Sequence, residues 1–544
     1  MNLAGNTDTL ERATSGRCII GIKELNRRSD YPVDIWFDSL KSAASVLSPE
    51  NRELMEVIKH KQPKTTTELA NLTGRAVSNV SRTLKTLNKH QLITLDAARY
   101  GVASINYHDF VILMGSSESP VFSPLEEAIE VLRDIALVHT PAGTENQAIV
   151  DQWLHALATD SQFYCDQNEN DPERLRSYVE GLLKKRCVFF NQKQFHDLVF
   201  SGTQLKPRFD SRVKFIDLFA GIGGMRLGFQ NIGGECVFSS EFDKQAQITY
   251  KKNYGEYPFG DITMINPDNI PAHDVLLAGF PCQPFSHAGL KKGIEDTRGT
   301  LFHDIARIIA AKQPKFAVLE NVKGLVSHEK GSTLKVILKT LIDLGYSCNV
   351  PREVIVSGST KEIQNYAKKM VLKSIDFGVP QNRQRIYIVL WRDGLIDKFE
   401  YPVARQEQTT VADILEKSPD PKLTISDRLW AGHKRRKLQN AKNGKGFGYG
   451  LVTPDSAYTN TISARYYKDG SEILIDQEPK NPRKISTREA ARLQGYPEEF
   501  VVSDSNVQAY KQFGNSVTVS VVQDIAERVF SYLNSETMVR EDVC

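Results

Sequence analysis

Long apolar runs are missing from this sequence, and cysteine is scarce. None of the apolar stretches is long enough to span a bilayer as a helix, and residues 1–17 contain no apolar core of the kind that marks a signal peptide. The seven cysteines lie far apart, and no CxxC or Cys/His pair has the spacing of a zinc site. We therefore expect a chain of the reducing cytoplasm, without disulfides, a membrane partner or a bound metal.

A strong excess of positive or negative charge is also absent. The chain has 69 lysines and arginines against 66 aspartates and glutamates, a net charge of +3. Any affinity for nucleic acid must therefore come from local basic clusters. With 40% hydrophobic and 25% charged residues the composition is that of a globular protein, and 544 residues are too many for one ordinary hydrophobic core. We expect several domains.

The segment beginning TTTELANLTG is the first with a recognisable pattern. Its threonines can cap a short helix, Gly74 suits the turn that follows, and apolar residues at helical spacing predict a second helix over residues 76–88. Residues 91–95 and 100–106 then alternate like the strands of a hairpin. This order is typical of a winged helix-turn-helix domain in an α-rich N-terminal region, residues 1–115.

The polar face of the second helix carries Asn79 and Arg82. If residues 76–88 form a recognition helix, these two side chains are candidates for DNA contacts. The alternative is an ordinary amphipathic helix whose polar face is solvated. The turn and hairpin around it favour DNA binding.

Four further segments follow. Residues 116–205 have helical periodicity but no chemical motif, which predicts a helical linker or an association region. Residues 213–395 alternate apolar strands with helices, which indicates an α/β catalytic domain with a mostly parallel sheet. Residues 396–482 lose this alternation and become basic and glycine-rich, and over residues 483–535 helices return as a C-terminal part of the catalytic domain.

Glycines directly follow the first of these strands, in FIDLFAGIGG. Gly221 and Gly223 let the backbone approach a ligand closely at the start of a helix. Glu241 ends the next strand, where an acid takes ribose hydroxyls in nucleoside-binding sites, and Asp261 lies in a further turn. This set indicates a nucleoside cofactor but does not distinguish NAD from S-adenosylmethionine.

A cysteine stands in a stiff turn just after another apolar strand, in GFPCQPFSHAG. The proline before Cys282 presents the thiol at the sheet edge where ligands bind, and a thiolate there can act as a nucleophile. Glu320 ends the next strand, so the same edge offers a carboxyl group. Arg383 and Arg385 alternate at a later strand, which predicts that both face one ligand. Taken alone, the cysteine is more simply an inert thiol, the glutamate a strand-end acid and the arginines surface charges. Together, at one edge of an α/β sheet, they form a specific combination.

Nine motifs follow one another in the second half of the chain. They are DLFAGIGG, SEFDK, GDIT, GFPCQPFS, DTRGTLFHDIARI, LENVKGLVSH, FGVPQNRQRIYIV, TREAARLQGYP and QAYKQFGNSV. They resemble, in the same order, those of the DNA (cytosine-5) methyltransferases, in particular those of bacterial restriction–modification systems. The resemblance covers residues 213 to about 530 and implies a Rossmann-like, S-adenosylmethionine-dependent sheet with a small target-recognition domain, residues 396–482.

The resemblance implies a role for each catalytic residue. Cys282 would attack C6 of cytosine, while Glu320 would hold N3 and the amino group so that the ring accepts the electrons. Asn321 would hold Glu320 or the base edge. Gln283 would begin a mobile loop that closes on DNA.

The resemblance gives the two arginines separate tasks. Arg385 would pair with the cytosine O2, and Arg383 would steady the closed loop and the sugar–phosphate. A base inside a duplex cannot reach such a site, so the target cytosine would be flipped out.

S-adenosylmethionine is the cofactor that the resemblance selects, with no metal. The glycine loop would border its methionine part, Glu241 its ribose, and Phe242 and Asp261 its adenine. The full set of implied cofactor residues is Phe219, Gly221, Gly223, Glu241, Phe242, Asp261, Pro281 and Asn515.

Sequence specificity would lie in residues 396–482. Basic residues there neutralise phosphates, and a few side chains read base edges. The candidates are Arg435, Arg436, Arg465 and Lys468. The alternative is that the segment around the last two is only the folded core of a small domain. One recognition segment implies one short site that contains G and C.

The expected function is methylation of cytosine C5 in double-stranded DNA, in the bacterial cytoplasm at the nucleoid. The chain would act beside a cognate restriction endonuclease, and its N-terminal domain would bind promoter DNA and regulate transcription. Two alternatives stay open. One is cytosine-5 methylation of tRNA by the same fold, and the other is a DNA-binding regulator whose catalytic fold is idle.

Overall fold

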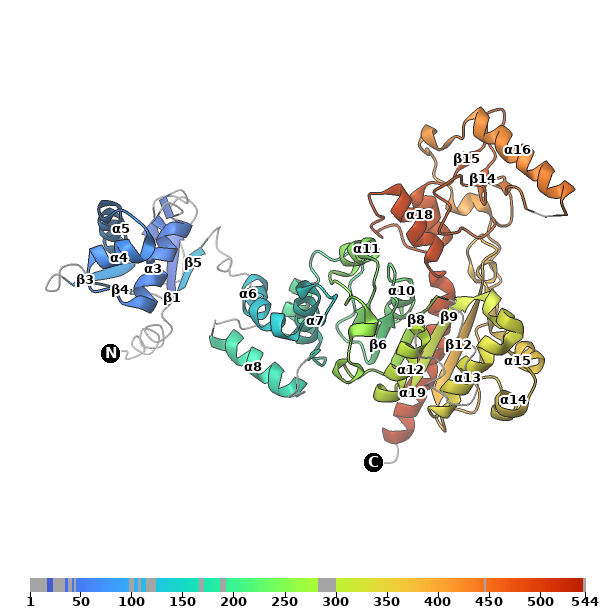
Figure 1. Cartoon of the computed structure of the whole chain (residues 1–544), viewed down its shortest axis with the longest axis horizontal. Helices are drawn as coiled ribbons and strands as arrows, with labels where there is room; N and C mark the ends of the chain where they lie inside the picture. The colour runs from blue at the N-terminus through green and yellow to red at the C-terminus, as the bar shows by residue number, and fades with distance from the viewer. Residues whose placement is uncertain are drawn as a thin grey trace, which may run out of the picture. The chain divides into compact units, whose positions relative to one another are not determined.

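The computed structural model describes most of the chain. The described residues are 17–22, 35–37, 42–43, 46–96, 102–105, 109–113, 124–165, 171–185, 192–281, 300–444 and 447–541. The chain divides into two compact units, residues 1–123 and residues 124–544 (Figure 1). Among the described residues, no helix is both long and apolar enough to cross a membrane.

The first unit combines helices with two small sheets. Its helices are α3 (Pro49–Lys61), α4 (Thr66–Thr73) and α5 (Val77–Lys89). The strands β1 (Arg17–Ile22), β2 (Ile35–Phe37) and β5 (Asp109–Leu113) form a parallel sheet, while β3 (Ile93–Asp96) and β4 (Val102–Ile105) pair antiparallel. Two helices and a strand pair therefore occur where the sequence pattern predicts them, and the parallel sheet is an addition to that pattern.

The sequence explains how α4 and α5 are held. The Thr65 hydroxyl accepts a hydrogen bond from the Glu68 N–H at 3.1 Å and caps α4. Gly74 ends that helix with a φ of 64°, a left-handed conformation that suits glycine. Leu84 on α5 is buried in the same hydrophobic core as Leu69 on α4, so a common core fixes the two helices against each other.

A seven-stranded sheet organises the second unit. Its strands are β6 (Val213–Leu218), β7 (Gly234–Ser240), β8 (Val275–Gly279), β9 (Phe316–Val322), β10 (Tyr346–Ser347), β11 (Val371–Lys373) and β12 (Gln384–Arg392). The order is β10–β12–β9–β8–β6–β7, with β11 paired to β12. Strands β7, β6, β8 and β9 run parallel, and β12 runs antiparallel to β9. The predicted α/β sheet is confirmed, with a reversed strand that brings its first residues to the carboxyl end of β9.

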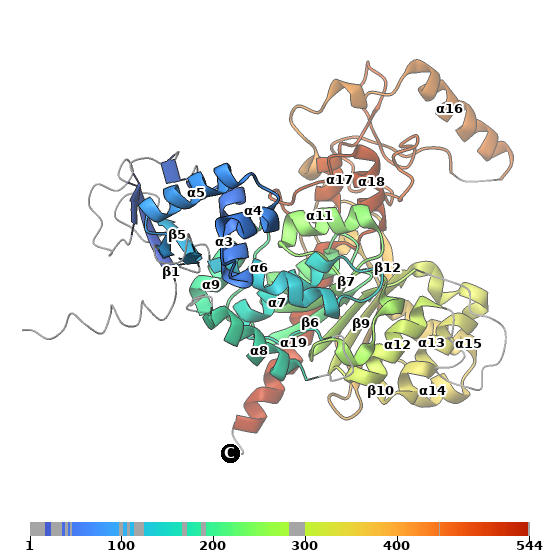
Figure 2. The same cartoon turned by 60° about the vertical axis from the view of Figure 1, so that its left-hand side comes forward.

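Helices cover both faces of this sheet. On one face α10 (Gly224–Asn231) and α19 (Val519–Glu541) share a core with the strands that includes Phe215, Phe229 and Val522. Figure 2 shows α12 (Leu301–Lys312) and α13 (Ser332–Asp343) over the other face. The remaining helices of this part are α11 (Lys244–Tyr254), α14 (Arg352–Ser357) and α15 (Thr360–Ala367).

A helical module, defined as the described residues between 124 and 205, belongs to the same unit as the sheet. It consists of α6 (Pro124–Ala136), α7 (Asn146–Thr159), α8 (Pro172–Lys185) and α9 (Gln192–Val199). The module packs on β7, the edge strand of the sheet. The Gln152 side chain donates to the Val237 carbonyl at 3.3 Å, and Tyr164 stacks on Phe238. The module therefore covers an edge whose backbone groups would otherwise lack partners.

Residues 396–482, which the sequence predicts to read the DNA site and which we call the recognition region, are built around a long helix and two short strands. These are α16 (Asp427–Lys442), β13 (Leu451–Val452) and β14 (Leu474–Ile475). The C-terminal part adds β15 (Arg483–Lys484), α17 (Thr487–Leu493) and α18 (Asn506–Asn515) before α19. Strand β15 pairs with β14, so the two parts share one small sheet.

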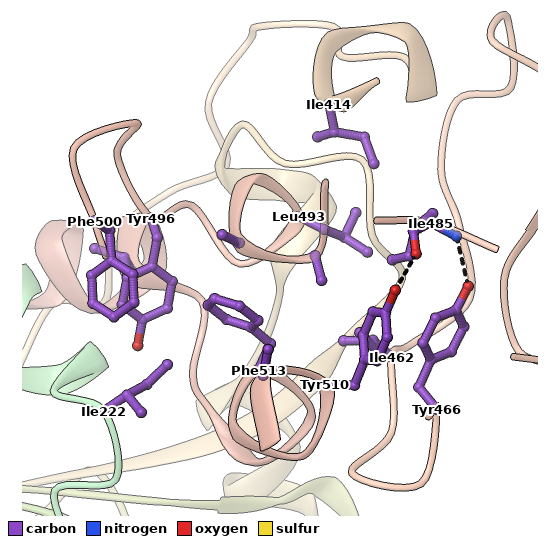
Figure 3. Close-up of a cluster of buried hydrophobic side chains, with 14 of the residues drawn as sticks. Ile222, Ile414, Ile462, Tyr466, Ile485, Leu493, Tyr496, Phe500, Tyr510 and Phe513 are labelled. Carbon is purple, nitrogen blue, oxygen red and sulfur yellow. Dashed lines mark hydrogen bonds between the residues drawn. The ribbon is translucent and has the colours of Figure 1, made fainter. Parts of the chain in front are cut away.

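One hydrophobic core joins three parts of the chain that are far apart in sequence (Figure 3). It contains Ile222 beside the glycine loop, Tyr466 from the recognition region and Phe513 from α18. The Tyr466 hydroxyl accepts from the Ile485 N–H at 2.9 Å, and the Tyr510 hydroxyl donates to the Ile485 carbonyl at 2.6 Å. The recognition region is thus anchored directly behind the glycine loop.

Candidate active site

A cavity of about 470 Å³ opens at the carboxyl ends of β6, β8 and β9. Open α/β sheets bind their ligands at this edge. Many of the residues predicted from sequence line it, namely Phe219, Gly221, Glu241, Phe242, Pro281, Glu320, Asn321, Arg385 and Asn515. The fold therefore brings the two predicted groups, the cofactor residues and the catalytic residues, to one space.

The loop between β6 and α10 depends on left-handed backbone conformations. Phe219, Gly221 and Gly223 have φ angles of 56°, 58° and 81°. A Cβ atom at Gly223 would lie 2.3 Å from the Tyr254 ring, so glycine is required there. The Tyr254 hydroxyl donates to the Gly223 carbonyl at 2.7 Å. Gly223 thus shapes the loop from behind and is not itself one of the cavity-lining residues.

Glu241 fixes the glycine loop and faces the cavity. Its Oε2 accepts from the Gly221 N–H at 2.7 Å, and its Oε1 accepts from the Asp243 N–H at 2.6 Å. Burial raises the pKa of Glu241, and these backbone hydrogen bonds oppose the rise. Phe242 beside it is 75% exposed and lines the cavity. A carboxyl group and a bare aromatic ring are therefore presented together.

Asp261 lies next to this part of the cavity but does not line it. Its Oδ1 accepts from the Thr263 N–H at 3.0 Å and from the Thr263 hydroxyl at 2.8 Å, so the carboxylate caps a short turn. Phe259 links the turn to Glu241, because its carbonyl accepts from the Glu241 N–H at 2.8 Å.

A buried ion pair forms another part of the cavity wall. The Nε of Arg385 lies 3.1 Å from Oε1 of Glu320, and Glu320 is only 8% exposed. Strand β12 sets this geometry, since its antiparallel register places Arg385 opposite Val322 at the end of β9. Burial raises the pKa of Glu320, and the charges of Arg385 and Arg383 oppose the rise. The site can therefore offer a carboxyl group that takes up a proton more readily than an exposed glutamate.

Asn321 has a different partner from the one expected. Its Nδ2 donates to the Phe280 carbonyl at 2.9 Å, and its Oδ1 accepts from the Val322 N–H at 2.8 Å. Both ends of the amide are engaged by backbone, so Asn321 does not hold the Glu320 carboxyl group. It fixes the chain just before Pro281 instead.

Arg383 does not share a ligand with Arg385. It is 2% exposed, and its guanidinium donates to the carbonyls of Ile462, Gly514 and Ser516. The prediction that both arginines face one ligand is wrong, because Arg383 precedes β12 and turns toward the recognition region and α18. Its other predicted task, to steady the closed loop and the sugar–phosphate, stays a prediction, because residues 282–299 lie outside the described part of the chain.

The end of α18 closes the cavity with residues that the sequence did not single out, apart from Asn515. Lys511, Gln512 and Ser516 line it as well. Lys511 forms an ion pair with Asp243, and the Gln512 side chain donates to the Gln245 carbonyl at 3.0 Å. These residues lie within or beside the motif QAYKQFGNSV, so the motif was the available signal.

Asp217 is a further cavity residue that sequence reasoning missed. It lies in β6, is 1% exposed and accepts from the Arg226 N–H at 3.2 Å. Burial raises its pKa to about 7. The available sequence signal was its place as the first residue of the motif DLFAGIGG.

Cys282 and Gln283 lie outside the described residues. The described chain reaches Pro281, which is exposed and lines the cavity, and resumes at Thr300. The nucleophile assigned from sequence therefore directly follows a cavity residue.

The candidate DNA contacts differ in how far they are engaged. Arg435, Arg465 and Lys468 are exposed. Arg436 instead forms an ion pair with Asp469 at 2.9 Å and donates to the Gly448 carbonyl, so it holds the recognition region together.

In the first unit, Asn79 and Arg82 are exposed on α5. Val77 on the same helix is also 44% exposed. This face of α5 is therefore not covered by the other described residues of its unit.

Comparison with known proteins gives one match over most of the second unit. The family described as C-5 cytosine-specific DNA methylase matches residues 213–531. A second family, described only as HVO_A0114, matches residues 46–112.

Curated relatives cover the same share of the chain. The Type II methyltransferase M.SsoII of Shigella sonnei is 55% identical over 330 residues, which are 60% of this chain and 82% of that protein. M.NlaX of Neisseria lactamica is 56% identical over 325 residues, 59% of this chain and 97% of that protein. M.HhaI of Haemophilus parahaemolyticus is 40% identical over 347 residues, 61% of this chain and 98% of that protein.

One solved structure matches this chain at low identity. The putative DNA modification methyltransferase of an Escherichia coli prophage is 21% identical, with a TM-score of 0.43 over 59% of this chain and all of that one.

Proposed function

Because this chain belongs to the C-5 cytosine-specific DNA methylase family, which matches residues 213–531, we propose that it transfers a methyl group from S-adenosylmethionine to C5 of a flipped-out cytosine in double-stranded DNA. The observation that carries this proposal is that two sets of residues line a single cavity. Glu241 and Phe242 line it beside the glycine loop, and the Glu320–Arg385 ion pair lines it at the end of β9. A cofactor and a base can meet in such a space.

The first set suits the nucleoside of S-adenosylmethionine. Glu241 offers carboxylate lone pairs to ribose hydroxyls, and the exposed ring of Phe242 offers a stacking face for adenine. The glycine loop lets the backbone approach the methionine part. When bound, the cofactor supplies an electrophilic methyl group; the residues of the chain hold it toward the base.

The second set suits the Watson–Crick edge of cytosine. A protonated Glu320 would donate to N3 and accept from the exocyclic amino group, and burial favours that protonated form. A hydrogen bond from the Arg385 Nε would hold the protonated carboxyl group in place, while the rest of the guanidinium reaches the cytosine O2. Asn321 would act indirectly, as a positioning residue, because it fixes the Phe280 carbonyl ahead of Cys282.

Methylation would proceed by addition to C6, methyl transfer to C5 and elimination of the cysteine. The Cys282 thiolate adds to C6, and the displaced electron pair is taken up at N3 with the proton of Glu320. C5 would become nucleophilic and take the methyl group, and the bond broken would be that between the methyl carbon and the sulfonium sulfur of the cofactor, which would leave as S-adenosylhomocysteine. Loss of the C5 proton to water breaks the bond between sulfur and C6, and N3 returns its proton to Glu320. Such chemistry requires the base to leave the duplex stack.

The biological setting follows from the relatives that are named Type II methyltransferases. We infer that the chain modifies a short DNA site in the bacterial cytoplasm and protects it from a cognate restriction endonuclease. The exposed Arg465 and Lys468 would contribute to site recognition, and Arg435 to phosphate binding.

We further infer that the first unit binds promoter DNA through α5. The support is a helix pair whose first helix is capped by Thr65, a strand pair that follows it, and a second helix on which Asn79 and Arg82 are exposed. Footprinting of residues 1–123 on the DNA upstream of the gene tests this. Protection that disappears with Arg82→Ala is expected, and no protection would refute it.

Bisulfite sequencing of DNA from cells that express the chain tests the main proposal. Methylation of cytosine within one short site is expected. Methyl transfer to tRNA, with none to duplex DNA, would overturn the substrate. Absence of transfer to either nucleic acid would indicate an idle catalytic fold.

A further inference from the structure

We propose that residues 141–145 of the helical module brace the adenosine end of the cofactor site, with Thr144 as a positioning residue for the turn at Gly260 and Asp261. These residues lie in the loop between α6 and α7 and fall outside the family match. The inference rests on the proposed cofactor site. It gives the module a role in cofactor binding that its sequence did not indicate.

The loop and the turn are in direct contact. The Thr144 hydroxyl accepts a hydrogen bond from the Gly260 N–H at 3.0 Å. A Cβ atom at position 260 would lie 2.0 Å from the Gly143 carbonyl oxygen, so the two backbones approach as closely as glycine allows. A Cβ atom at Gly143, in turn, would lie 3.9 Å from the Cβ of Asp261.

The same loop contacts a second segment at this end of the cavity. Glu145 forms an ion pair with Lys244 at 2.6 Å. Lys244 is the first residue of α11 and follows Phe242 and Asp243, which line the cavity. The loop therefore contacts two segments at this end of the cavity, the turn at Gly260 and the start of α11 at Lys244.

Backbone hydrogen bonds connect the turn at Gly260 and Asp261 to Glu241 in the cavity wall. The Phe259 N–H donates to the Ser239 carbonyl at 2.8 Å, and the Phe259 carbonyl accepts from the Glu241 N–H at 2.8 Å. Gly260 follows Phe259 directly. A shift of the turn therefore moves the backbone of Glu241, whose carboxyl group lines the cavity and holds Gly221.

The module can act as a brace because buried polar contacts fix it to the sheet. His155 on α7 lies 3.3 Å from Glu235 on β7 and 3.2 Å from Glu256. Asp151 accepts from Lys251 at 2.6 Å and from the Tyr257 N–H at 2.9 Å. Three of the partners, Lys251, Glu256 and Tyr257, lie just before the turn at Gly260. These contacts of α7 therefore fix the position from which residues 141–145 reach the turn.

The test compares three threonine variants of the full chain. Thr144→Val removes the hydroxyl at nearly constant volume, and Thr144→Ser keeps a hydroxyl. Thr159→Val makes the same change at the other end of α7, where the hydroxyl bonds to the His155 carbonyl and the Ser161 hydroxyl and interacts with Glu235, so this variant disturbs the attachment of the module without touching the turn. Calorimetric titration with S-adenosylhomocysteine measures cofactor binding without turnover. We expect Thr144→Val to raise the Kd on the order of fivefold, the factor for one ordinary hydrogen bond. Thr144→Ser and Thr159→Val should stay near the parent value.

A second measurement separates positioning from general loosening. Hydrogen exchange of peptides that cover residues 257–264 should speed up in Thr144→Val and not in Thr159→Val. Steady-state kinetics should show the change in KM for S-adenosylmethionine, with kcat at saturation close to that of the parent chain. An unchanged Kd in Thr144→Val, or an equal loss in Thr159→Val, would overturn the brace.

Glu241→Ala distinguishes failure of the brace from failure of the cofactor site itself. Loss of S-adenosylhomocysteine binding in this variant supports the site on which the brace depends. Parent-like binding in Glu241→Ala would refute the proposed cofactor site, whatever the threonine variants show.

Discussion

The Nε of Arg385 lies 3.1 Å from Oε1 of Glu320 because β12 runs antiparallel to β9. The start of one strand and the end of the other thereby meet at the carboxyl edge of the sheet. Burial makes the Glu320 carboxyl group easier to protonate, while the arginine keeps it in place. This pair offers both the proton and the orientation that activation of a cytosine ring requires.

Glu320→Gln should slow methyl transfer on the order of 100-fold or more, because a glutamine amide cannot pass a proton to N3 and take it back. Transfer of labelled methyl groups to duplex DNA measures this. Glu353→Gln, an exposed glutamate on α14, is the matched control and should retain parent activity. Near-normal turnover of Glu320→Gln would mean that another group activates the ring.

Cys282→Ala should lose turnover by several orders of magnitude, because the variant lacks the thiolate that we propose forms the bond to C6. S-adenosylhomocysteine should still bind with parent affinity, since the described cofactor residues are unchanged. A single-turnover assay combined with calorimetry checks both expectations. A Cys282→Ala protein that still methylates DNA would rule out the nucleophile.

His155 should make the stability of the second unit depend on pH. Burial disfavours its charge, but Glu256 and Glu235 outweigh burial and raise its pKa to about 9 from 6.5. A raised histidine pKa stabilises the folded state fully below pH 6.5, and this contribution is lost as pH rises through about 9. Thermal unfolding between pH 6 and 9.5 measures the decline.

His155→Gln should remove much of that decline and lower the unfolding free energy by about 3 kcal/mol near pH 6, since a buried charge network loses its cation. The carboxyl group of Glu256 should make stability fall at acidic pH instead. Burial raises its pKa, but Arg226 and His155 outweigh burial and lower it to about 2 from 4.5, so its contribution is lost as pH falls from 4.5 toward 2. A Tm profile of His155→Gln parallel to that of the parent chain would contradict the assignment.

Arg383→Met should destabilise the chain by roughly 2 kcal/mol or more, because three buried carbonyls lose their donor. It should not change the salt dependence of DNA binding, since Arg383 is buried. Arg465→Ala should do the reverse, with a parent-like Tm and a salt-dependence slope reduced by about 1 if the guanidinium contacts a phosphate. Filter binding over a range of salt concentrations, together with thermal melts, separates the two.

The parallel strands β6, β7, β8 and β9 and their ligand edge could be predicted because each is a short apolar run followed by a glycine, an acid or the Pro-Cys turn, whereas the short strands β10 and β11 have no such pattern. The glycine loop, Glu241 and Glu320 therefore stand where sequence placed them relative to the strands. The direction of β12 could not be predicted in this way, because an apolar run such as RIYIVLW reads the same in either orientation. The two arginines were expected to share a ligand because they alternate in sequence, but Arg383 lies before β12 begins, so the alternation of the strand does not extend to it.

The docking of the helical module had no sequence signal either. Its contacts to the sheet run through side chains such as Gln152, Asp151 and His155, which local pattern assigns to a solvated helix face. Only the partners on β7 and beside α11, about a hundred residues away, explain why those polar groups are buried. The apolar periodicity of one segment does not indicate which distant residues will pair with its polar side chains.

The core that joins Ile222, Tyr466 and Phe513 divides the recognition region into two kinds of position. Side chains that enter this core support the glycine loop from behind, so their identity is tied to catalysis whichever DNA site is read. Exposed side chains such as Arg465 and Lys468 do not enter this core and do not support the loop. Target preference can therefore diverge by substitutions on the outer surface alone, whereas exchange of the whole segment between relatives succeeds only if the inward-facing residues travel with their packing partners.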